Sequence, residues 1–327
     1  MPRSVGTLLI VCFALVYAAC VEPELAATTA SQDAPPMSSS EPTVTSTTEE
    51  PEAVTTTTGS APRSHAALDV PYNHDHDRQV LDVHTPAGSG PFPTILAVHG
   101  GRFQLNSKNF YRLYSEYFPS KGIAFVPTNY RLVPGATYPA QVEDVHCALA
   151  WIHANADEYD LDPERVIVLG GSAGGHLAAM LGTVDQRELY AGNCPNSLPA
   201  SPIAGAVIFY GFFDFNTIDD YPPSNYGAFN MYWGATYEEL EPEQLAEMSP
   251  ISWIDGSEPP FLLIHGTRDT SIPSVMSERF VAALEDAGAS GELVLVDSGH
   301  GFENYPLNFP EQEESLASIE ELIANLP

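Results

Sequence analysis

A single serine, Ser172, stands among glycines between two apolar runs in the stretch VIVLGGSAGGHLAAM, residues 166–180. Residues 170–174 fit the pattern G-x-S-x-G, in which a sharp turn between a buried strand and a helix lifts the serine above the sheet. Residues beside such a turn must be small, and the N-terminus of the next helix favours a developing negative charge. We therefore interpret Ser172 as a nucleophile. The alternative is a glycine-rich turn that only packs a helix on a strand.

A serine hydroxyl is a poor nucleophile unless a base and an orienting acid activate it. In folds with this turn, the three residues follow the chain order serine, acid, histidine. Asp269 comes just after the apolar run FLLIHG, and His300 comes just after LVLVDSG. The carboxyl ends of parallel strands converge on one crevice. We therefore predict Ser172, Asp269 and His300 as the catalytic residues.

Three other residues compete for these roles. Asp297 lies three residues before His300, where the strand ends, and is less well placed to orient it. His265 precedes a glycine on its strand, and we interpret it as a packed, hydrogen-bonded residue. His176 follows the serine by four residues on the same helix, which is too local for a base, so we assign it to the core.

The sequence VHGGRF, residues 98–103, supplies a second element of acyl-transfer chemistry. Attack on an ester carbonyl produces an oxyanion, which requires preorganised backbone donors. An HGG turn after an early strand provides donors together with the N–H that follows the nucleophile, here that of Ala173. Gly101 and Arg102 are the candidate donors of this loop, Gly100 permits the turn, and His99 is expected to brace it.

The elements that must position these residues alternate along the chain from residue 65. Strands separated by helices imply parallel crossovers and a sheet covered on both faces, so the fold class is α/β. The patterns predict strands at 78–86, 93–100, 123–132, 165–171, 203–211, 259–266 and 291–299, and helices at 109–122, 139–159, 173–182, 274–288 and 311–326.

One long segment, residues 212–250, interrupts this alternation and is rich in aromatic residues and proline. A connection of this length is usually a functional insertion. We interpret it as a cap or lid over the site, with a structural excursion that covers the sheet edge as the alternative. The candidate substrate-binding residues are Phe103, Phe213, Tyr232 and Trp233.

The N-terminal residues have the character of targeting and tethering segments. Residues 1–20 contain a short apolar run that ends in small residues and Cys20, which indicates an export signal. Cys20 resembles a bacterial lipoprotein acylation site, and cleavage after Ala18 with release is the alternative. Residues 21–64 are rich in Thr, Ser, Pro and Glu and are expected to form a disordered linker. The folded domain is then residues 65–327, in an exported cell-envelope lipoprotein or a secreted or periplasmic protein.

Charge and cysteine content exclude some functions. The formal net charge is −31, with 43 acidic and 12 basic residues, which disfavours binding to nucleic acid and to anionic lipid surfaces. Contact with a membrane is therefore expected only through the N-terminal lipid anchor. Cys147 and Cys194 remain after the signal, and an oxidising compartment would permit a disulfide, which the sequence alone leaves open.

With these elements in place, the chain resembles the α/β-hydrolases. It resembles most the bacterial bifunctional feruloyl and acetyl-xylan esterases and the related hormone-sensitive-lipase-like carboxylesterases. The resemblance covers residues 68–325. It is carried by YRLVPGATYPAQVEDVHCALAWIHANADEYDLDPERVIVLGGSAGGHLAAMLG and PPFLLIHGTRDTSIP. It implies that Ser172 is the nucleophile, His300 the general base and acid, and Asp269 the orienting acid, with no metal or other cofactor.

The chain departs from these families at three positions. Arg102 replaces the usual third glycine after HGG, and Gly171 replaces the aspartate that precedes the serine in the lipase-like branch. Phe103 stands where related esterases and formamidases often have tryptophan. The side chain of Arg102 could attract an anionic substrate group, or it could face solvent with only its backbone used.

We therefore expect a serine esterase that hydrolyses short acyl or aryl esters through an acyl-enzyme. Acetyl or feruloyl groups on polysaccharides are substrates that the resemblance implies. An amidase or formamidase with the same triad is one alternative. A catalytically silent surface binding protein is the other.

Overall fold

The computed structural model describes residues 65–184 and 190–326, all within the unit Gly59–Pro327. The export signal at 1–20, the acylation site at Cys20 and the linker at 21–64 lie outside the described residues. In the part of the chain that is described, no helix has the length and apolar character needed to cross a membrane.

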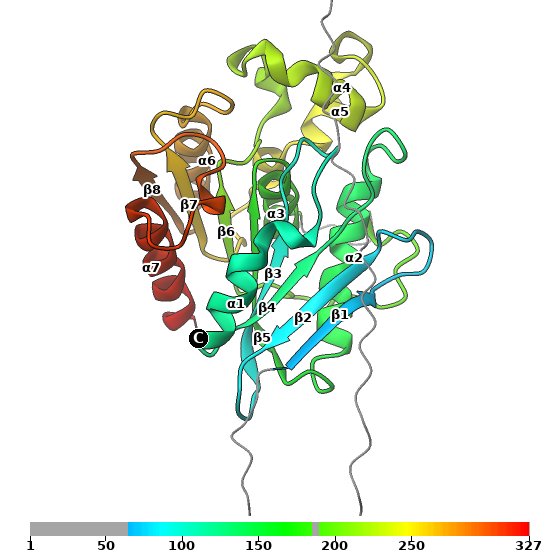
Figure 1. Cartoon of the computed structure of the whole chain (residues 1–327). Coiled ribbons are helices and arrows are strands. Elements are labelled where there is room, and N and C mark those ends of the chain that lie inside the picture. The colour runs from blue at the N-terminus through cyan, green and yellow to red at the C-terminus, as the bar shows by residue number, and fades with distance from the viewer. Residues whose placement is uncertain (1–64, 185–189, 327) are drawn as a thin grey trace, which may run out of the picture. The chain divides into compact units, whose positions relative to one another are not determined.

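An eight-stranded sheet forms the centre of the described domain (Figure 1). Its strand order is β1-β2-β4-β3-β5-β6-β7-β8; β1–β2 and β2–β4 are antiparallel pairs and the remaining pairs are parallel. This arrangement confirms the predicted α/β-hydrolase fold. The strands are β1 His65–Pro71, β2 Val80–Thr85, β3 Phe92–Val98, β4 Ala124–Thr128, β5 Leu161–Gly171, β6 Gly205–Phe209, β7 Phe261–Gly266 and β8 Gly291–Val296.

Strand β1 was missed by the sequence patterns, and the strand expected over 123–132 ends earlier, at Thr128. Most positions of β1 are exposed and none is buried, so the strand lacks the apolar alternation that marks a half-buried strand. An edge strand of this kind is held by its backbone pairing to β2, which leaves little trace in the residue types.

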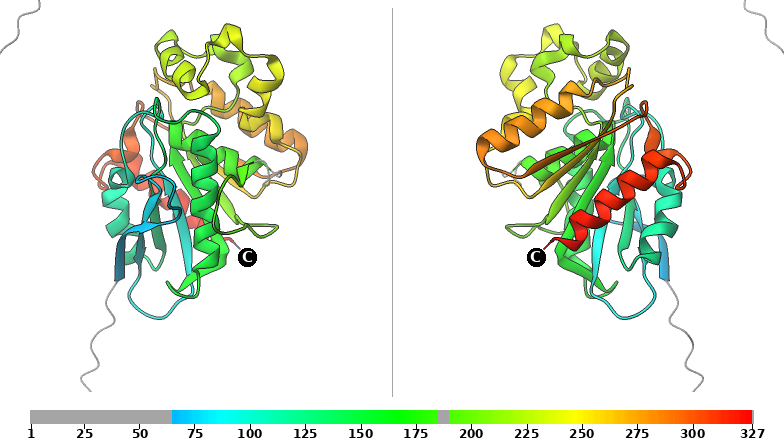
Figure 2. Two further views of the ribbon diagram at one scale, coloured as in Figure 1. Left: turned by 90° about the vertical axis from the view of Figure 1, so that its right-hand side faces the viewer. Right: turned by 90° about the vertical axis from the view of Figure 1, so that its left-hand side faces the viewer.

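Helices cover both faces of the sheet (Figure 2). Alternate residues of each central strand point to opposite faces, so Leu96 of β3 belongs to one apolar core and Ile95 to the other. The first core also contains residues of α2, α3 and α6, and the second contains residues of α1 and α7. These helices are α1 Arg112–Ser120, α2 Ala140–Ala154, α3 Ala173–Thr183, α6 Val275–Ala287 and α7 Pro310–Ala324.

The inserted segment 212–250 folds into short helices above the sheet (Figure 1). Its α-helices are α4 Tyr226–Trp233 and α5 Pro242–Glu247; the 3-10 segments Phe215–Asp220 and Pro223–Asn225 precede α4, and Tyr237–Glu239 lies between the two helices. Phe229 of α4 packs edge-on against Phe212 and Phe215, with ring centroids 4.7 and 5.1 Å apart. The aromatic residues of the insertion therefore pack on one another and extend the first apolar core of the domain.

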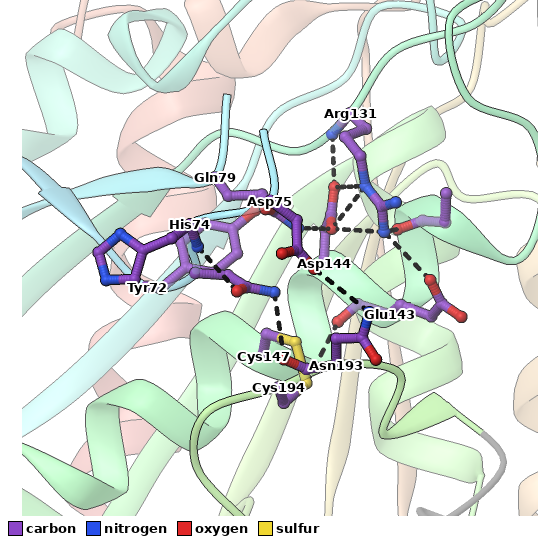
Figure 3. The surroundings of a disulfide bond; sticks show 12 residues. Tyr72, His74, Asp75, Gln79, Arg131, Glu143, Asp144, Cys147, Asn193 and Cys194 are labelled. Carbon is purple, nitrogen blue, oxygen red and sulfur yellow. Dashed lines mark hydrogen bonds and ion pairs between the residues drawn. A yellow bond between two sulfur atoms is a disulfide. The ribbon is translucent and has the colours of Figure 1, made fainter. Parts of the chain in front are cut away.

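A disulfide joins Cys147 of α2 to Cys194 in the connection between α3 and β6 (Figure 3). The two Cα atoms are 5.1 Å apart across a sequence separation of 47 residues. Nearby on the same helix, Asp144 receives hydrogen bonds from the backbone and guanidinium of Arg131. The connection after α3 is thus fixed covalently to α2, which packs beside α3.

Candidate active site

Ser172 occupies the turn between β5 and α3, with backbone angles of φ 56° and ψ −121°. This conformation is strained for any residue with a side chain. The helix can follow at once because residue 174 is glycine; a Cβ atom there would collide with the carbonyl oxygen of Val98 in β3. Glycine therefore lets α3 lie directly against β3, and the turn directs the serine towards the carboxyl end of the sheet.

The structure brings the three predicted catalytic side chains into one hydrogen-bonded chain. His300 Nε2 lies 3.0 Å from Ser172 Oγ, and His300 Nδ1 lies 2.7 Å from Asp269 Oδ2. The other carboxylate oxygen, Oδ1, accepts hydrogen bonds from the backbone N–H groups of Ser271 (2.7 Å) and Ile272 (2.9 Å). The order serine, histidine, aspartate is the arrangement in which a histidine can take the serine proton while a carboxylate orients it.

The environment of Asp269 keeps it ionised. Its side chain is fully buried, and burial raises its pKa. Hydrogen bonds from His265 and His300, the charge of His300 and the N–H of Ile272 outweigh burial, so the pKa is lowered below its ordinary value. His265 itself is fixed by Ser277 Oγ at 2.7 Å and by the Ile272 carbonyl at 2.9 Å. The carboxylate is thus an acceptor for His300 over the whole neutral range.

The competing residues lie elsewhere. Asp297 is exposed and forms an ion pair with Arg268 at 2.9 Å. His176 is buried; its Nδ1 lies 3.0 Å from the carbonyl oxygen of Phe212 and its Nε2 lies 3.1 Å from Tyr232 Oη. Burial lowers the pKa of His176 to about 4, although the Phe212 carbonyl opposes this, so the ring is neutral. His176 therefore hydrogen-bonds to the inserted segment 212–250 and holds it against α3.

Backbone N–H groups for an oxyanion come from two segments. Gly100, Gly101 and Arg102 line the same cavity of about 290 Å³ as Ser172. Ala173 is the first residue of α3, where the backbone N–H groups have no partner within the helix. Arg102 has a φ of 57°, which is uncommon for a residue with a side chain. These four residues therefore remain the candidates for the oxyanion hole.

A set of hydrogen bonds fixes the loop that carries Gly100. His99 Nδ1 lies 2.7 Å from the Gly100 carbonyl oxygen, and Asn106 Nδ2 donates to the same oxygen at 3.2 Å. Burial lowers the pKa of His99 to about 3; the Gly100 carbonyl opposes this and the charge of Arg78 adds to it. A neutral imidazole that donates from Nδ1 can accept from Arg78 Nη2 at its other nitrogen, 3.4 Å away. His99 thus holds the loop through its contact with the Gly100 carbonyl, as expected.

The predicted substrate-binding residues Phe103, Phe213, Tyr232 and Trp233 do not line the cavity, and this assignment is wrong. All four are buried. Phe103 stacks on Tyr232 with ring centroids 3.9 Å apart, and Phe213 stacks on Phe280 at 4.3 Å. The Phe103–Tyr232 and Phe213–Phe280 pairs join the inserted segment to the domain beneath it, whereas the Trp233 ring packs on Phe215 and Phe229 within the insertion.

Other residues form the wall of the cavity. The Tyr210 ring lies 4.5 Å from the His300 imidazole, between centroids, and its φ is 38°. Such a tyrosine at the end of β6 carries no motif that sequence reasoning could detect. Besides the predicted residues, the wall contains Leu105, Asn106, Phe110, Tyr210, Phe212, Asn225, Ser271, Ile272, Gly301, Glu303 and Asn304.

Glu303 is an unexpected member of this wall. It lies in the 3-10 turn η7, Phe302–Asn304, three residues after His300. Burial raises its pKa to about 8, against the effect of its own backbone N–H. Its Oε1 lies 2.5 Å from the point that a Cβ atom at Gly171 would occupy. The glycine next to the nucleophile therefore leaves space for this carboxyl group.

The fold and the hydrogen-bonded serine, histidine and aspartate together define a protein of the α/β-hydrolase class. Within that class the chain belongs to the BD-FAE family, whose pattern matches residues 81–284. The match includes Ser172 and Asp269 and ends before His300.

The chain is similar in sequence to several named esterases. It is 30% identical over 247 residues to esterase LipQ of Mycobacterium tuberculosis, an alignment that covers 72% of this chain and 57% of LipQ. It is 28% identical over 231 residues to a probable isoprenylcysteine alpha-carbonyl methylesterase, ICMEL1, of Arabidopsis thaliana, with 68% and 48% covered. The chain thus spans about half the length of these curated relatives.

Solved structures share the fold. A bifunctional GH43-CE protein of Bacteroides eggerthii superposes with a TM-score of 0.69 at 26% identity, over 79% of this chain and 35% of that one. A propionate-bound thermophilic esterase, Est2 of Thermogutta terrifontis, superposes with a TM-score of 0.64 at 23% identity, over 80% and 93%. The second likeness is one of fold alone.

Proposed function

We propose that this protein is a serine esterase that hydrolyses carboxylic esters through an acyl-enzyme. The observation that carries the proposal is the continuous hydrogen-bonded chain from Asp269 through His300 to Ser172, which ends in an open cavity. Membership of the BD-FAE family and the esterase relatives support the same activity.

The proposed reaction has two steps. Ser172 Oγ attacks the ester carbonyl while His300 Nε2 removes its proton, and the carbonyl oxygen gains negative charge near the N–H groups of Gly101, Arg102 and Ala173. The protonated His300 then donates to the leaving alcohol, which leaves the acyl group on the serine. Water, activated by the same nitrogen, releases the acid and restores the serine. Asp269 holds the imidazole and stabilises its charged form throughout.

The substrates we propose are esters of short acyl or aryl acids, including acetyl or feruloyl groups on polysaccharides. A cavity of about 290 Å³ suits a small acyl group and the first part of an alcohol. The Est2 esterase with a similar fold is described as bound to propionate, and the Bacteroides eggerthii protein as a bifunctional GH43-CE protein. These descriptions belong to those proteins and support the substrate class proposed here.

We also propose that the protein is exported, either as a lipoprotein acylated at Cys20 or as a released protein. The sequence of residues 1–20 supports export. The Cys147–Cys194 disulfide also supports it, because such bonds persist in oxidising compartments. Labelling with a radioactive fatty acid tests acylation: label on the parent chain and none on Cys20→Ser supports the lipoprotein, and no label on either favours release.

A hydrolysis panel with the purified protein tests the activity. p-Nitrophenyl esters of increasing chain length are compared with methyl ferulate, acetylated xylan and a formamide. Ser172→Ala should abolish ester turnover, whereas Ser318→Ala, a half-buried position on α7 whose hydroxyl donates to the Glu314 carbonyl, should not. Turnover that survives Ser172→Ala would refute the proposal. Turnover of the formamide alone would make the protein an amidase, and a folded protein inactive on the whole panel would be a binding protein.

A further inference from the structure

Most of the basic residues that the structure describes form ion pairs, and the two that do not lie in or against the loop Gly100–Asn106. The structure describes nine lysines and arginines, and seven of them lie within ion-pair distance of a carboxylate: Arg112, Arg131, Arg165, Arg268, Arg279 and both lysines. Among the described residues, Arg78 and Arg102 have no such carboxylate. Arg78 contacts the segment from Gly100 to Asn106, and Arg102 belongs to this segment, which lines the cavity together with Ser172. In a chain of net charge −31, this placement requires an explanation.

Arg78 is engaged in holding the loop. Its Nε donates to the Tyr130 carbonyl at 2.8 Å, its Nη2 donates to the Asn106 carbonyl at 3.0 Å, and Nη2 also faces His99 Nε2. In these contacts the guanidinium faces two backbone carbonyl oxygens and the neutral ring of His99. Arg78 therefore adds positive charge behind the loop, while its hydrogen-bonding groups serve the structure.

Arg102 is not engaged in this way. Arg102 is exposed and is one of the residues that line the cavity, and the one polar contact of its side chain among the described residues is Nη1 to the Ser224 carbonyl at 3.5 Å. That distance exceeds the usual range of an N–H···O hydrogen bond. A guanidinium carries five N–H donors in a planar fork and stays protonated at every physiological pH. Most of these donors are free to bind a ligand in the cavity.

The rest of the cavity wall does not neutralise Arg102. Glu303 is the one carboxylic acid among the residues that line the cavity, and with its pKa raised to about 8 by burial it is mainly uncharged at pH 7. The side chain of Asp269 is fully buried, and its carboxylate is paired with His300 Nδ1 at 2.7 Å. The wall therefore carries a positive charge beside Ser172, whereas the protein as a whole repels anions.

We propose that the substrate carries a carboxylate close to its ester bond and that the Arg102 guanidinium binds this carboxylate. The proposal rests on the esterase function above and narrows its substrate class. The carboxylate could belong to the acyl part, as in a monoester of a dicarboxylic acid, or to the alcohol part, as in an acylated hydroxy acid or uronic acid. Planar carboxylates match the guanidinium fork, so Lys at this position should serve less well.

Matched pairs of esters test the proposal and distinguish the two sources of the carboxylate. For the acyl part, p-nitrophenyl hemisuccinate is compared with p-nitrophenyl butyrate, which has an acyl chain of the same length. For the alcohol part, meta-acetoxybenzoate is compared with meta-acetoxybenzamide. The measured quantity is the ratio of kcat/KM within each pair for the parent protein, Arg102→Gln, Arg102→Lys and the control Arg112→Gln. Arg112 is an exposed arginine on α1 that does not line the cavity.

In at least one pair, Arg102→Gln should lower the preference for the anionic ester about tenfold, mainly through KM, and Arg102→Lys should lower it less. Arg112→Gln should leave the ratio unchanged, and added salt should reduce the preference of the parent protein. Because Arg102 also contributes its backbone N–H, a general loss of activity would affect both esters of a pair equally. Equal losses, or a parent protein with no preference in either pair, would overturn the proposal.

Binding measurements separate this proposal from the esterase function. Calorimetry with Ser172→Ala should show that the protein binds the anionic ester of the preferred pair more tightly, and that adding Arg102→Gln removes the difference. Tighter anion binding without turnover by the parent protein would refute the esterase function and leave the Arg102 site standing. Turnover of neutral esters without tighter anion binding would refute the Arg102 site and leave the esterase function standing.

Discussion

The carboxyl group of Glu303 lies in the space that a side chain at Gly171 would enter, with Oε1 2.5 Å from the position of the missing Cβ. Members of the lipase-like branch that the sequence resembles have an aspartate at the position of Gly171. In this protein a carboxyl group reaches the neighbourhood of the nucleophile from η7, the turn that follows His300.

Gly171→Ala should place a methyl group against the Glu303 carboxyl and disturb the turn at Ser172. We expect a fall in kcat/KM of roughly 100-fold and a free energy of unfolding lower by about 1 to 3 kcal/mol, the usual cost of overpacking. Combining it with Glu303→Ala should restore part of both losses, because the obstructing carboxyl is gone. A double-mutant cycle measures this coupling. The control is Gly227→Ala, where a Cβ meets nothing within 4 Å, and strictly additive effects would show that the two residues do not share this space.

Glu303 should make the stability of the protein fall as the pH rises. Burial raises its pKa to about 8, above the value of about 4.3 in an unfolded chain. The folded state then holds a proton that the unfolded state loses, so the stabilising contribution is complete below pH 4 and is lost as the pH rises to 8. The loss is on the order of 5 kcal/mol.

Glu303→Gln removes this titration, and thermal unfolding from pH 5 to pH 9 measures it. The parent protein should lose several degrees more of Tm over this range than the variant does. Tyr111 and Tyr114 face the same carboxyl, and the pKa of each is raised above 10, mainly by burial, so neither titrates in this window. If Tm changed with pH in the same way in the parent protein and in Glu303→Gln, the raised pKa of Glu303 would be contradicted.

Asp269→Asn should reduce kcat by about three orders of magnitude while KM changes little, because an amide cannot hold and stabilise the protonated His300 as a carboxylate does. Steady-state kinetics with a p-nitrophenyl ester measure the loss. Because the pKa of Asp269 is lowered, the acid limb of the kcat/KM profile should not report this residue. Asp297→Asn is the matched control, since that carboxylate is exposed and bonded to Arg268. Similar losses in both variants would reject the triad.

Replacing both Cys147 and Cys194 by alanine should lower the free energy of unfolding by about 2 to 4 kcal/mol, because the bond closes a loop of 47 residues in the unfolded chain. This corresponds to a fall in Tm of roughly 5 to 10 °C. Reduction of the parent protein should give the same Tm, whereas the variant should not respond to reductant. An unchanged Tm in the reduced parent would show that the bond does not stabilise the fold.

Residue types and chain order were sufficient to predict that the side chains of Ser172, His300 and Asp269 lie together. Ser172 and Asp269 follow apolar runs that become buried in β5 and β7, His300 follows the edge strand β8, and parallel strands must place their ends together. The loop at Gly100 was predicted for the same reason. These positions are determined by topology, which the alternation of strands and helices makes visible.

The cavity wall could not be predicted in the same way. Phe212 faces the cavity while Phe213, the next residue, stacks on Phe280 in the core, and both are aromatic residues of one irregular segment. No periodic pattern tells such neighbours apart. Glu303 was missed because an acidic residue in a loop is ordinarily solvated. The one available signal was Gly171, a glycine where the resembling branch has an aspartate.

His176 gives the inserted segment a fixed attachment to the helix that begins after the nucleophile. One ring nitrogen meets the carbonyl of Phe212, at the first residue of the insertion, and the other meets the hydroxyl of Tyr232, near the end of α4. A chimera that imports this segment from a relative must therefore supply an oxygen atom at both points or exchange His176 at the same time. For engineering a new substrate range, the transferable unit is residues 212–250 together with this one histidine.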